Sequence, residues 1–435
     1  MTSIPTRQPA RASLAAFVGT TIEWYDFYIY ATAAALIFGK LFFPSNEPFY
    51  STLASFGTFA VGFFARPLGG LVFGHLGDRI GRKKALVATL SIMGLGTVGI
   101  GFLPTYASAG ALAPALLVAL RIAQGIAIGG EWGGAVLMAG EHAPKEKRTF
   151  LASFAQLGSP AGLILALLAF RSVAHLDKAA LFSWGWRLPF VASAVLLVVG
   201  LLIRSGVGES PEFEALKTQR RTAALPILDV LRDSWRTVLL CLGANVIGVA
   251  GAWFVNTFML NYTTQTLGLD RALILDCLFV VAFIQFFTQL ASGWFAQRVG
   301  AGRFLKLAAG LAMLSPYPMF VLVSTGKPAA IVVGIAIAVM CMSSSYAVMA
   351  GFMTNAFPVR VRYSAISISY QCCAALAGGL TPLVGTLLAH DFPGQWWPLA
   401  LFYSALAAVS LGCIAVLQRR QPAAAQAGAA IALTE

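Results

Sequence analysis

The stretch Gly74-His-Leu-Gly-Asp78-Arg79-Ile-Gly81-Arg82-Lys83-Lys84 lies between two long apolar segments and decides the fold. It places one acid among four bases in a glycine-rich turn. Such a turn lets two membrane helices reverse direction closely and keeps positive charge on one side of the bilayer. A looser copy, Gly293-Trp-Phe-Ala-Gln297-Arg298-Val-Gly300-Ala-Gly-Arg303, follows 219 residues later in the 435-residue chain. Because this spacing is about half of the chain, the sequence predicts a duplicated half-molecule, as in many transporters.

A second repeated element supports the duplication. Ala143-Pro144-Lys-Glu-Lys-Arg148 and Phe357-Pro358-Val-Arg360-Val-Arg362 are 214 residues apart. The copies differ in charge, because Asp78 corresponds to Gln297 and Glu141 corresponds to Asn355. Both acids of the first half are therefore neutral amides in the second half.

The composition indicates a membrane protein. A soluble globular domain carries about 25% charged residues, whereas this chain is 58% hydrophobic and 11% charged. Twelve apolar runs of about 20 residues recur between residues 15 and 418, each long enough to cross the ~30 Å hydrocarbon core of a bilayer. Their centres fall near Ile29, Phe63, Leu95, Ile128, Leu163, Val195, Val249, Phe283, Leu311, Ile335, Leu376 and Leu406. The predicted fold is an all-α integral membrane protein with twelve transmembrane helices in two pseudo-symmetric six-helix bundles.

The longest polar interruption lies near the midpoint and divides the chain. We expect a cytoplasmic tail over residues 1–14, a first six-helix bundle over 15–205 and a cytoplasmic linker over 206–236. A second six-helix bundle over 237–418 and a cytoplasmic tail over 419–435 complete the predicted organisation.

The positive charges are divided by membrane side. If the N-terminus is cytoplasmic and the spans alternate, 22 lysines and arginines face the cytoplasm and 6 face the other side, while Arg66 and Arg121 lie inside spans. This division is the positive-inside pattern, and it accounts for the net charge of +13 without a nucleic-acid partner. We expect a multi-pass protein of a bacterial inner (plasma) membrane with both termini in the cytoplasm.

The cysteines and histidines give no indication of a metal site. All six cysteines fall within predicted spans, where a cysteine ordinarily packs as a small apolar residue. No CxxC pair or Cys/His cluster is present, and no nucleophile lies in a pattern with a general base. The sequence therefore predicts no metal, no cofactor, no catalytic residue and no enzymatic activity.

Five ionisable side chains are expected inside the first-half spans, namely Glu23, Asp26, Arg66, Arg121 and Glu131. An ionised side chain at a helix centre costs roughly 2.5–3.5 kcal/mol on insertion scales, so those that are retained are usually paired and functional. Counting about 1.5 Å per residue from the span ends groups Glu23, Arg66 and Glu131 in the cytoplasmic half. Asp26 is expected between this group and Arg121.

Two interpretations of these charges remain open. In one, a static ion-pair network holds the helices together. In the other, one carboxylate among Asp26, Glu23 and Glu131 takes up a proton while an arginine holds an anion, and we expect Arg121 to be this anchor. Desolvation disfavours an ionised carboxylate and a nearby arginine favours it. An anion that engages the arginine would then free the acid to bind a proton, which is a route to coupled transport.

The second half offers neutral hydrogen-bonding groups in place of charges. Most such groups are expected to join helices, and we choose Asn256 and Tyr370 as residues that line a cavity. The predicted substrate-binding residues are Arg121, Arg66, Tyr30, Gln124, Asn256 and Tyr370.

These motifs resemble those of a known family. The Gly74–Lys84 stretch resembles the signature loop of the major facilitator superfamily between its second and third helices, and Arg121-Ile-Ala-Gln124-Gly125 resembles another of its motifs. Five more motifs resemble those of the metabolite:proton symporter family: Glu23-Trp-Tyr-Asp26-Phe, Arg66-Pro-Leu-Gly, Gly129-Gly-Glu131-Trp-Gly-Gly, Trp184-Gly-Trp-Arg187-Leu-Pro-Phe and Glu209-Ser-Pro-Glu-Phe. The resemblance spans residues 15–418.

The resemblance implies two six-helix bundles around a central cavity, alternating access, and proton-driven uptake of small organic acids or zwitterions. It also implies a cytoplasmic gate made by Gly74, Asp78, Arg79, Gly81, Arg82, Glu141 and Arg148.

We therefore expect a monomeric secondary transporter in the lipid bilayer that takes up protons with a small organic acid. The acid could be shikimate-like, a dicarboxylate or an aromatic carboxylate. The alternatives are a proton/osmolyte symporter for betaine or proline, and a drug/proton antiporter. A membrane protein that binds a ligand without transporting it belongs to a different class and would accumulate nothing in vesicles.

Overall fold

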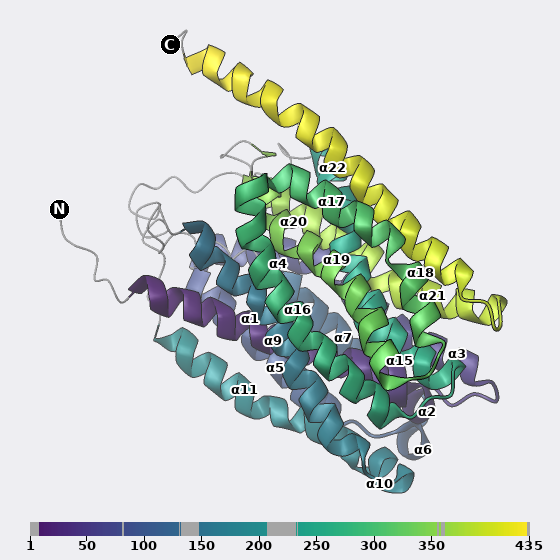
Figure 1. Cartoon of the computed structure of the whole chain (residues 1–435). Helices are drawn as coiled ribbons and strands as arrows, with labels where there is room; N and C mark the ends of the chain where they lie inside the picture. The colour runs from purple at the N-terminus through teal and green to yellow at the C-terminus, as the bar shows by residue number, and fades with distance from the viewer. Residues whose placement is uncertain are drawn as a thin grey trace.

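The computed structural model describes residues 8–80, 82–129, 131, 148–206, 232, 234–354, 356–357 and 362–432. Every regular element within these ranges is a helix (Figure 1). The first half contains α1 (Gln8–Ala33), η1 (Ala34–Phe38), α2 (Gly39–Phe42), α3 (Pro48–Phe64), α4 (Arg66–Ile80), α5 (Arg82–Gly101), α6 (Tyr106–Ala109), α7 (Leu112–Gly129), α9 (Arg148–Ala174), α10 (Lys178–Ser183), η3 (Gly185–Arg187) and α11 (Leu188–Ser205). The second half contains α14 (Trp235–Trp253), η4 (Phe254–Phe258), α15 (Met259–Asn261), η5 (Tyr262–Thr266), α16 (Arg271–Val299), α17 (Ala301–Leu314), α18 (Pro316–Val323), α19 (Pro328–Thr354), α20 (Arg362–Cys373), η6 (Ala374–Gly378), α21 (Gly379–Asp391) and α22 (Trp397–Ala432).

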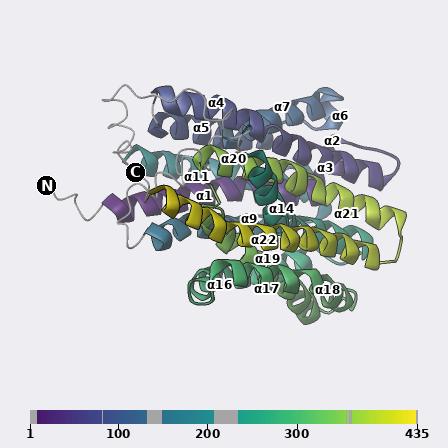
Figure 2. The same ribbon diagram turned by 90° about the horizontal axis from the view of Figure 1, so that it is seen from above.

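The helices run side by side along one axis. Eleven helical segments in the described ranges are long and apolar enough to cross a membrane, and they match the last eleven predicted spans. The first predicted span is α1, which is less apolar because it carries two carboxylates and three tyrosines. In Figure 2, α4, α5 and α7 lie on one side of the bundle and α16, α17 and α18 on the other.

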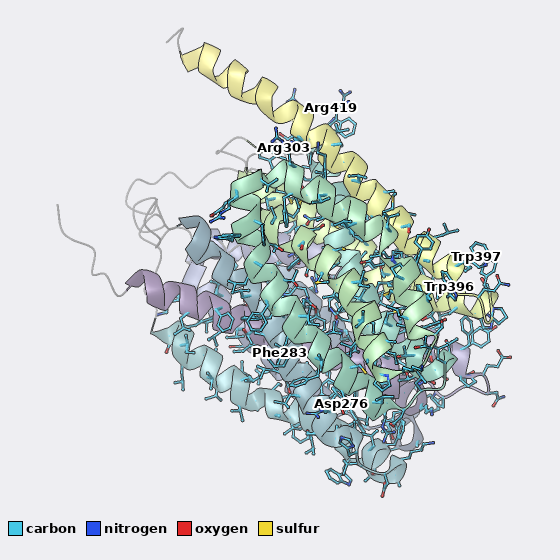
Figure 3. All side chains as sticks on the ribbon, viewed as in Figure 1. Asp276, Phe283, Arg303, Trp396, Trp397 and Arg419 are labelled. Carbon is cyan, nitrogen blue, oxygen red and sulfur yellow. The ribbon has the colours of Figure 1, made fainter. Side chains whose placement is uncertain are left out.

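The two ends of the bundle differ in composition. We call the end where α1 begins and α22 finishes the terminal end, and the other the opposite end (Figure 2). Arg303 and Arg419 lie toward the terminal end, whereas Asp276, Trp396 and Trp397 lie toward the opposite end (Figure 3). The helix α22 continues to Ala432, past the predicted boundary at residue 418, because alanine has the highest helix propensity.

The two copies of the signature stretch lie mainly in helices. The structure corrects the expected eleven-residue turn at Gly74–Lys84, because α4 is helical through Ile80 and α5 begins at Arg82. In the second copy α16 ends at Val299, α17 begins at Ala301, and Gly300 between them has φ 93°, a conformation that favours glycine.

Glycines bring the helices of the first half close enough to position the buried charges. A Cβ atom at Gly129 of α7 would collide with the carbonyl oxygen of Arg66 on α4. A Cβ atom at Gly162 of α9 would lie 2.7 Å from the Cβ of Trp24 on α1. Small residues at such crossings let membrane helices approach backbone to backbone. These contacts set the places of Arg66 and Trp24.

The two halves are joined at the opposite end. Arg171 of α9 forms an ion pair with Asp276 of α16. Arg271, at the start of α16, donates hydrogen bonds to the carbonyl oxygens of Ala174 at 3.2 Å and Leu176 at 2.8 Å. These contacts close the seam between α9 and α16 at this end.

We expect the charge reversal Arg171→Glu to lower the melting temperature by about 1–3 °C, because it sets two acids against each other at the seam. The double variant Arg171→Glu/Asp276→Arg restores the attraction and is expected to recover most of the loss. Differential scanning fluorimetry of the purified protein measures both. A double variant no more stable than the single one would contradict a direct pairing.

Candidate functional site

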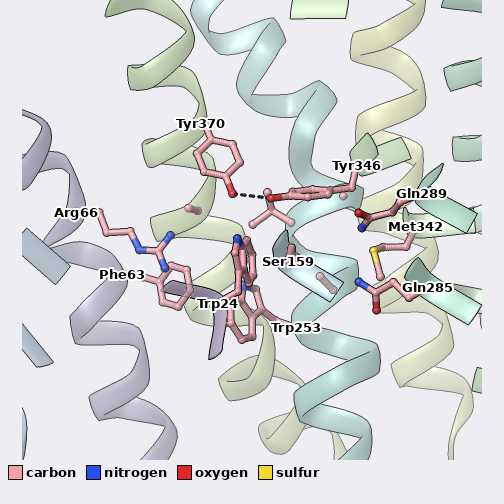
Figure 4. A pocket seen from close by; sticks show the side chains of 14 residues that line it. Trp24, Phe63, Arg66, Ser159, Trp253, Gln285, Gln289, Met342, Tyr346 and Tyr370 are labelled. Atoms are coloured by element: carbon pink, nitrogen blue, oxygen red, sulfur yellow. Dashed lines mark hydrogen bonds between the residues drawn. The ribbon is translucent and has the colours of Figure 1, made fainter. Parts of the chain in front are cut away.

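A small cavity lies between the two halves (Figure 4). Among the side chains that line it are Trp24, Arg66, Trp253, Gln289, Tyr346 and Tyr370. The empty space has room for little more than a water molecule. The side chains therefore close around the cavity in this conformation.

An aromatic cluster forms one wall of the cavity and joins the halves. Trp253 of α14 packs among rings of the first half, with centroid distances of 4.8 Å to Phe59 and 5.4 Å to Phe63. Its indole also stacks on that of Trp24 at 5.8 Å with 20° between the planes, and lies 5.2 Å from Tyr28. All of these side chains are buried, so the second half inserts one large ring into the core of the first.

Arg66 presents a guanidinium group to the cavity. It is buried on α4, and its central carbon lies 3.8 Å from the ring centroid of Phe63 and 4.3 Å from that of Phe27. Its Nε atom has no hydrogen-bond partner among the described residues. Ring faces attract the positive charge but leave the N–H groups of the guanidinium available to an anion.

Arg121 lies apart from this cavity, inside the first half. Its guanidinium carbon is 3.9 Å from the ring centroid of Tyr30 and 5.6 Å from that of Phe27. Its Nη1 donates a 3.0 Å hydrogen bond to Gln124, whose amide donates in turn to Thr97 at 2.8 Å. Arg121, Tyr30 and Gln124 thus form a group, and Phe27 stands between the two arginines.

Asp26 is deeply buried in the first half. It is 2% exposed, and neither of its carboxylate oxygens has a hydrogen-bond partner there. It lies within electrostatic range of Arg121 and near the hydroxyl of Thr97. The sequence placed Asp26 beside Arg121, and the structure brings the two together without a direct bond.

Glu131 has a different partner from the one that the sequence indicated. It accepts a hydrogen bond from Arg204 of α11 in a buried ion pair, and Arg204 also donates to the carbonyl oxygen of Leu86 at 2.7 Å. Glu23 lies within electrostatic range of Glu131, Arg204 and Arg66. The expected grouping of Glu23, Arg66 and Glu131 is therefore present, but Arg204, which we placed among the cytoplasmic bases, holds Glu131. A long arginine side chain at a span end can reach back into the bundle.

The second half contributes neutral groups, as expected. The prediction that Asn256 lines the cavity is wrong, because Asn256 is buried behind the wall and donates a 3.3 Å hydrogen bond to Gln285, which does line it. Tyr370 lines the cavity itself, and its hydroxyl lies 3.3 Å from that of Tyr346. Gln289 also lines the cavity, although the sequence did not separate it from the other polar residues of its span.

Some expected features lie outside the described residues. These are the side chains of the predicted cytoplasmic gate: Gly74, Asp78, Arg79, Gly81, Arg82, Glu141 and Arg148. Within the described part of the chain, no group of three or more histidine, cysteine, aspartate or glutamate residues is placed to hold a metal ion.

The chain is similar in sequence to known transport proteins. The model of the Major Facilitator Superfamily matches residues 16–372 and, in an overlapping match, residues 249–432. Over 397 residues the chain is 38% identical to the shikimate transporter of Escherichia coli (strain K12), covering 90% of each chain. It is 35% identical to an inner membrane metabolite transport protein of the same strain, covering 94% of this chain and 93% of the other. It is 30% identical to the proline/betaine transporter of that strain, covering 92% of this chain and 82% of the other.

Solved structures share the arrangement of helices. The xylose transporter from E. coli in a partially occluded inward open conformation superposes with a TM-score of 0.76 at 16% identity, over 93% of this chain and 97% of the other. A D-xylose-proton symporter superposes with a TM-score of 0.74 at 18% identity, over 94% of this chain and 97% of the other. The predicted all-α fold is confirmed.

The contrast between Glu131 and Asp26 can be tested by stability. We expect Glu131→Gln to lower the melting temperature clearly, because Arg204 would remain buried opposite a neutral amide, and removing one partner of a buried pair costs about 3–5 kcal/mol. Asp26→Asn removes a charge that has no hydrogen-bond partner among the described residues, so it is expected to leave the melting temperature unchanged or raise it. Thermal unfolding of the two purified variants gives the comparison. Equal losses in both would refute the distinction.

Proposed function

This chain belongs to the Major Facilitator Superfamily, and we propose that it takes up a small organic acid together with protons by alternating access. As a member of that family it is a multi-pass membrane protein and a secondary transporter of metabolites, not an enzyme. The observation that carries the proposal is the guanidinium of Arg66, which lines the cavity between the halves. A buried cation there is suited to a substrate carboxylate.

Arg66 is proposed as the anion anchor. Guanidinium binds a carboxylate through charge-assisted hydrogen bonds, often two in parallel. The position on the cavity wall supports this role and distinguishes Arg66 from Arg121, whose Nε and Nη2 atoms also have no hydrogen-bond partner among the described residues. Trp24 and Trp253 supply the apolar wall against which the rest of a small acid would rest. The transported anion would thereby touch α4 of the first half and α14 of the second.

Asp26 is proposed as the proton carrier, with Arg121 as its modulator. A buried carboxylate without a hydrogen bond is costly in the ionised form, so Asp26 is suited to travel with a proton. Arg121 offers the positive charge that would favour release of that proton when the bundle rearranges. Phe27 packs against both arginines. A movement of Arg66 toward a bound anion would therefore shift the Phe27 ring and change its contact with Arg121. Glu23 is the second acid within range of Arg66, whereas Glu131 is held by Arg204.

Orientation and environment follow from the same proposal. We place the protein in a bacterial inner membrane with its terminal end toward the cytoplasm, which is the side expected for the concentration of arginine and lysine. The ion pair between Arg171 and Asp276 would then close the outer side. We propose that the monomer is the transporting unit.

A zwitterion such as betaine or proline is the second candidate. Trp24, Trp253 and Tyr346 line the same cavity, and aromatic faces attract a quaternary ammonium group. A relative named as a proline/betaine transporter is 30% identical. The two candidates are distinguished by measuring which of shikimate and glycine betaine displaces the other from the protein at the lower concentration. The third interpretation, drug/proton antiport, has only the Gly158-Ser159-Pro160 sequence within α9 in its favour.

Uptake is expected to depend on an inward proton gradient. Accumulation of labelled shikimate in proteoliposomes should rise as the external pH falls and collapse when a protonophore is added. Asp26→Asn is expected to abolish accumulation while retaining exchange of labelled for unlabelled substrate, because exchange needs no net proton movement. Accumulation by the variant at the wild-type level would rule out Asp26 as the proton carrier.

The anchor is expected to be Arg66 rather than Arg121. Arg66→Gln should weaken binding of the carboxylate about 10- to 100-fold, the effect of losing one charged hydrogen-bond partner, as measured by isothermal titration calorimetry. The exposed Lys178 near the opposite end serves as a control, and Lys178→Gln should leave affinity unchanged. If Arg121→Gln abolishes binding while Arg66→Gln does not, the anchor is Arg121 and the proposed role of Arg66 is wrong.

A further inference from the structure

Gln289 is a polar residue of the cavity to which the proposed function gives no role. It lies on α16, is 4% exposed and lines the cavity. Neither its Oε1 nor its Nε2 atom has a hydrogen-bond partner among the described residues. A buried amide whose polar atoms have no partners destabilises the conformation that contains it. A side chain kept in this state is suited to a partner that arrives with the substrate.

The surrounding residues are already engaged with one another. Gln285, one turn away on the same face of α16, accepts a hydrogen bond from Asn256 at 3.3 Å. The hydroxyl groups of Tyr346 and Tyr370 lie 3.3 Å apart. These contacts hold the walls around Gln289 in place, and they leave its amide directed at the cavity.

The chemistry of the amide restricts what can satisfy it. An amide offers two N–H donors and one acceptor oxygen. A hydroxyl group both donates and accepts, so it can pair with either end. A carboxylate can accept from the N–H groups but leaves the amide oxygen without a donor, while a quaternary ammonium group has no N–H to donate and no lone pair to accept. A hydroxyl is therefore the complementary group.

The positions of Arg66 and Gln289 define the rest of the ligand. Figure 4 shows Arg66 on one side of the indoles of Trp24 and Trp253, and Gln289 on the other. A ligand that reaches both must carry its carboxylate and its hydroxyl at separate positions of an apolar body that packs on the indoles. A small ring bearing one carboxylate and at least one hydroxyl has this form.

We propose that Gln289 binds a hydroxyl group of the transported acid and so selects hydroxylated ring carboxylates over acids of the same shape that lack hydroxyls. This inference rests on the proposed function, since it assigns the carboxylate to Arg66. Gln289 belongs to the second half and Arg66 to the first, so such a ligand bridges the two halves.

The test compares two acids that differ only in their hydroxyl groups. Shikimate carries a carboxylate and three hydroxyls on a cyclohexene ring, and cyclohex-1-ene-1-carboxylate carries the carboxylate alone. We expect the full-length protein in nanodiscs to bind shikimate about 10- to 100-fold more tightly by calorimetry, because a site built for a hydroxyl is left unpaired by the analogue. Gln289→Leu should remove this preference by weakening shikimate binding while leaving binding of the analogue unchanged or improved. The same exchange at the exposed Gln265, Gln265→Leu, is the matched control and should preserve the preference.

The outcomes separate this inference from the proposed function. If wild-type protein binds both acids equally, or if Gln289→Leu weakens both by the same factor, the hydroxyl-binding role is overturned while carboxylate transport stands. If neither acid binds and glycine betaine does, both proposals fall together. The wild-type ratio needs no variant, and Gln289→Met provides a second test if the leucine variant does not fold.

Discussion

The insertion of Trp253 into the aromatic core of the first half is the interaction on which the site depends. Its ring contacts Phe59, Phe63 and Trp24, and aromatic pairs of this kind contribute about 0.5–1.5 kcal/mol each beyond the area that they bury. In a bilayer, where lipid tails are as apolar as the side chains, such packing has to hold the halves together without a hydrophobic driving force. The contact of Trp253 with the first half therefore both joins the two halves and forms one wall of the cavity. Any substrate that enters between the halves must meet this ring.

The buried charges divide into two groups because of the same aromatic packing. Phe27 and Phe63 hold Arg66 at the cavity, and Tyr30 and Phe27 hold Arg121 deeper in the first half. Asp26 stands near Arg121 with no hydrogen bond among the described residues, whereas Glu131 is fixed by Arg204. The sequence left two alternatives, a static ion-pair network and a proton-coupled network. The structure contains residues suited to each of them. We propose that the ion pair between Glu131 and Arg204 holds the helices together, and that Asp26 binds and releases the transported proton.

Much of the fold follows from the sequence, because membrane spans need long apolar runs and a duplicated chain repeats its helix breaks. The break at Gly300 lies within the second copy of the repeated motif. The partner of Glu131 could not be predicted, because the reach of Arg204 back into the bundle depends on its rotamer and on the tilt of α11. Nor could the sequence separate Arg66 from Arg121, or Gln289 from Asn256. Which of two polar residues faces a cavity depends on the rotation of its helix, and that is set by packing against helices far away in the chain.

The central claim is that a carboxylate substrate is transported together with a proton and that Asp26 carries this proton. It is tested most directly by measuring proton uptake from the medium while substrate is added. Proteoliposomes in a weakly buffered medium, with the membrane potential clamped, would receive shikimate while a dye reports the external pH. The account predicts that the medium becomes more alkaline in proportion to shikimate entering, and that the signal disappears in Asp26→Asn although exchange continues. Shikimate entry with no change in external pH, or an unaltered signal in the variant, would contradict it.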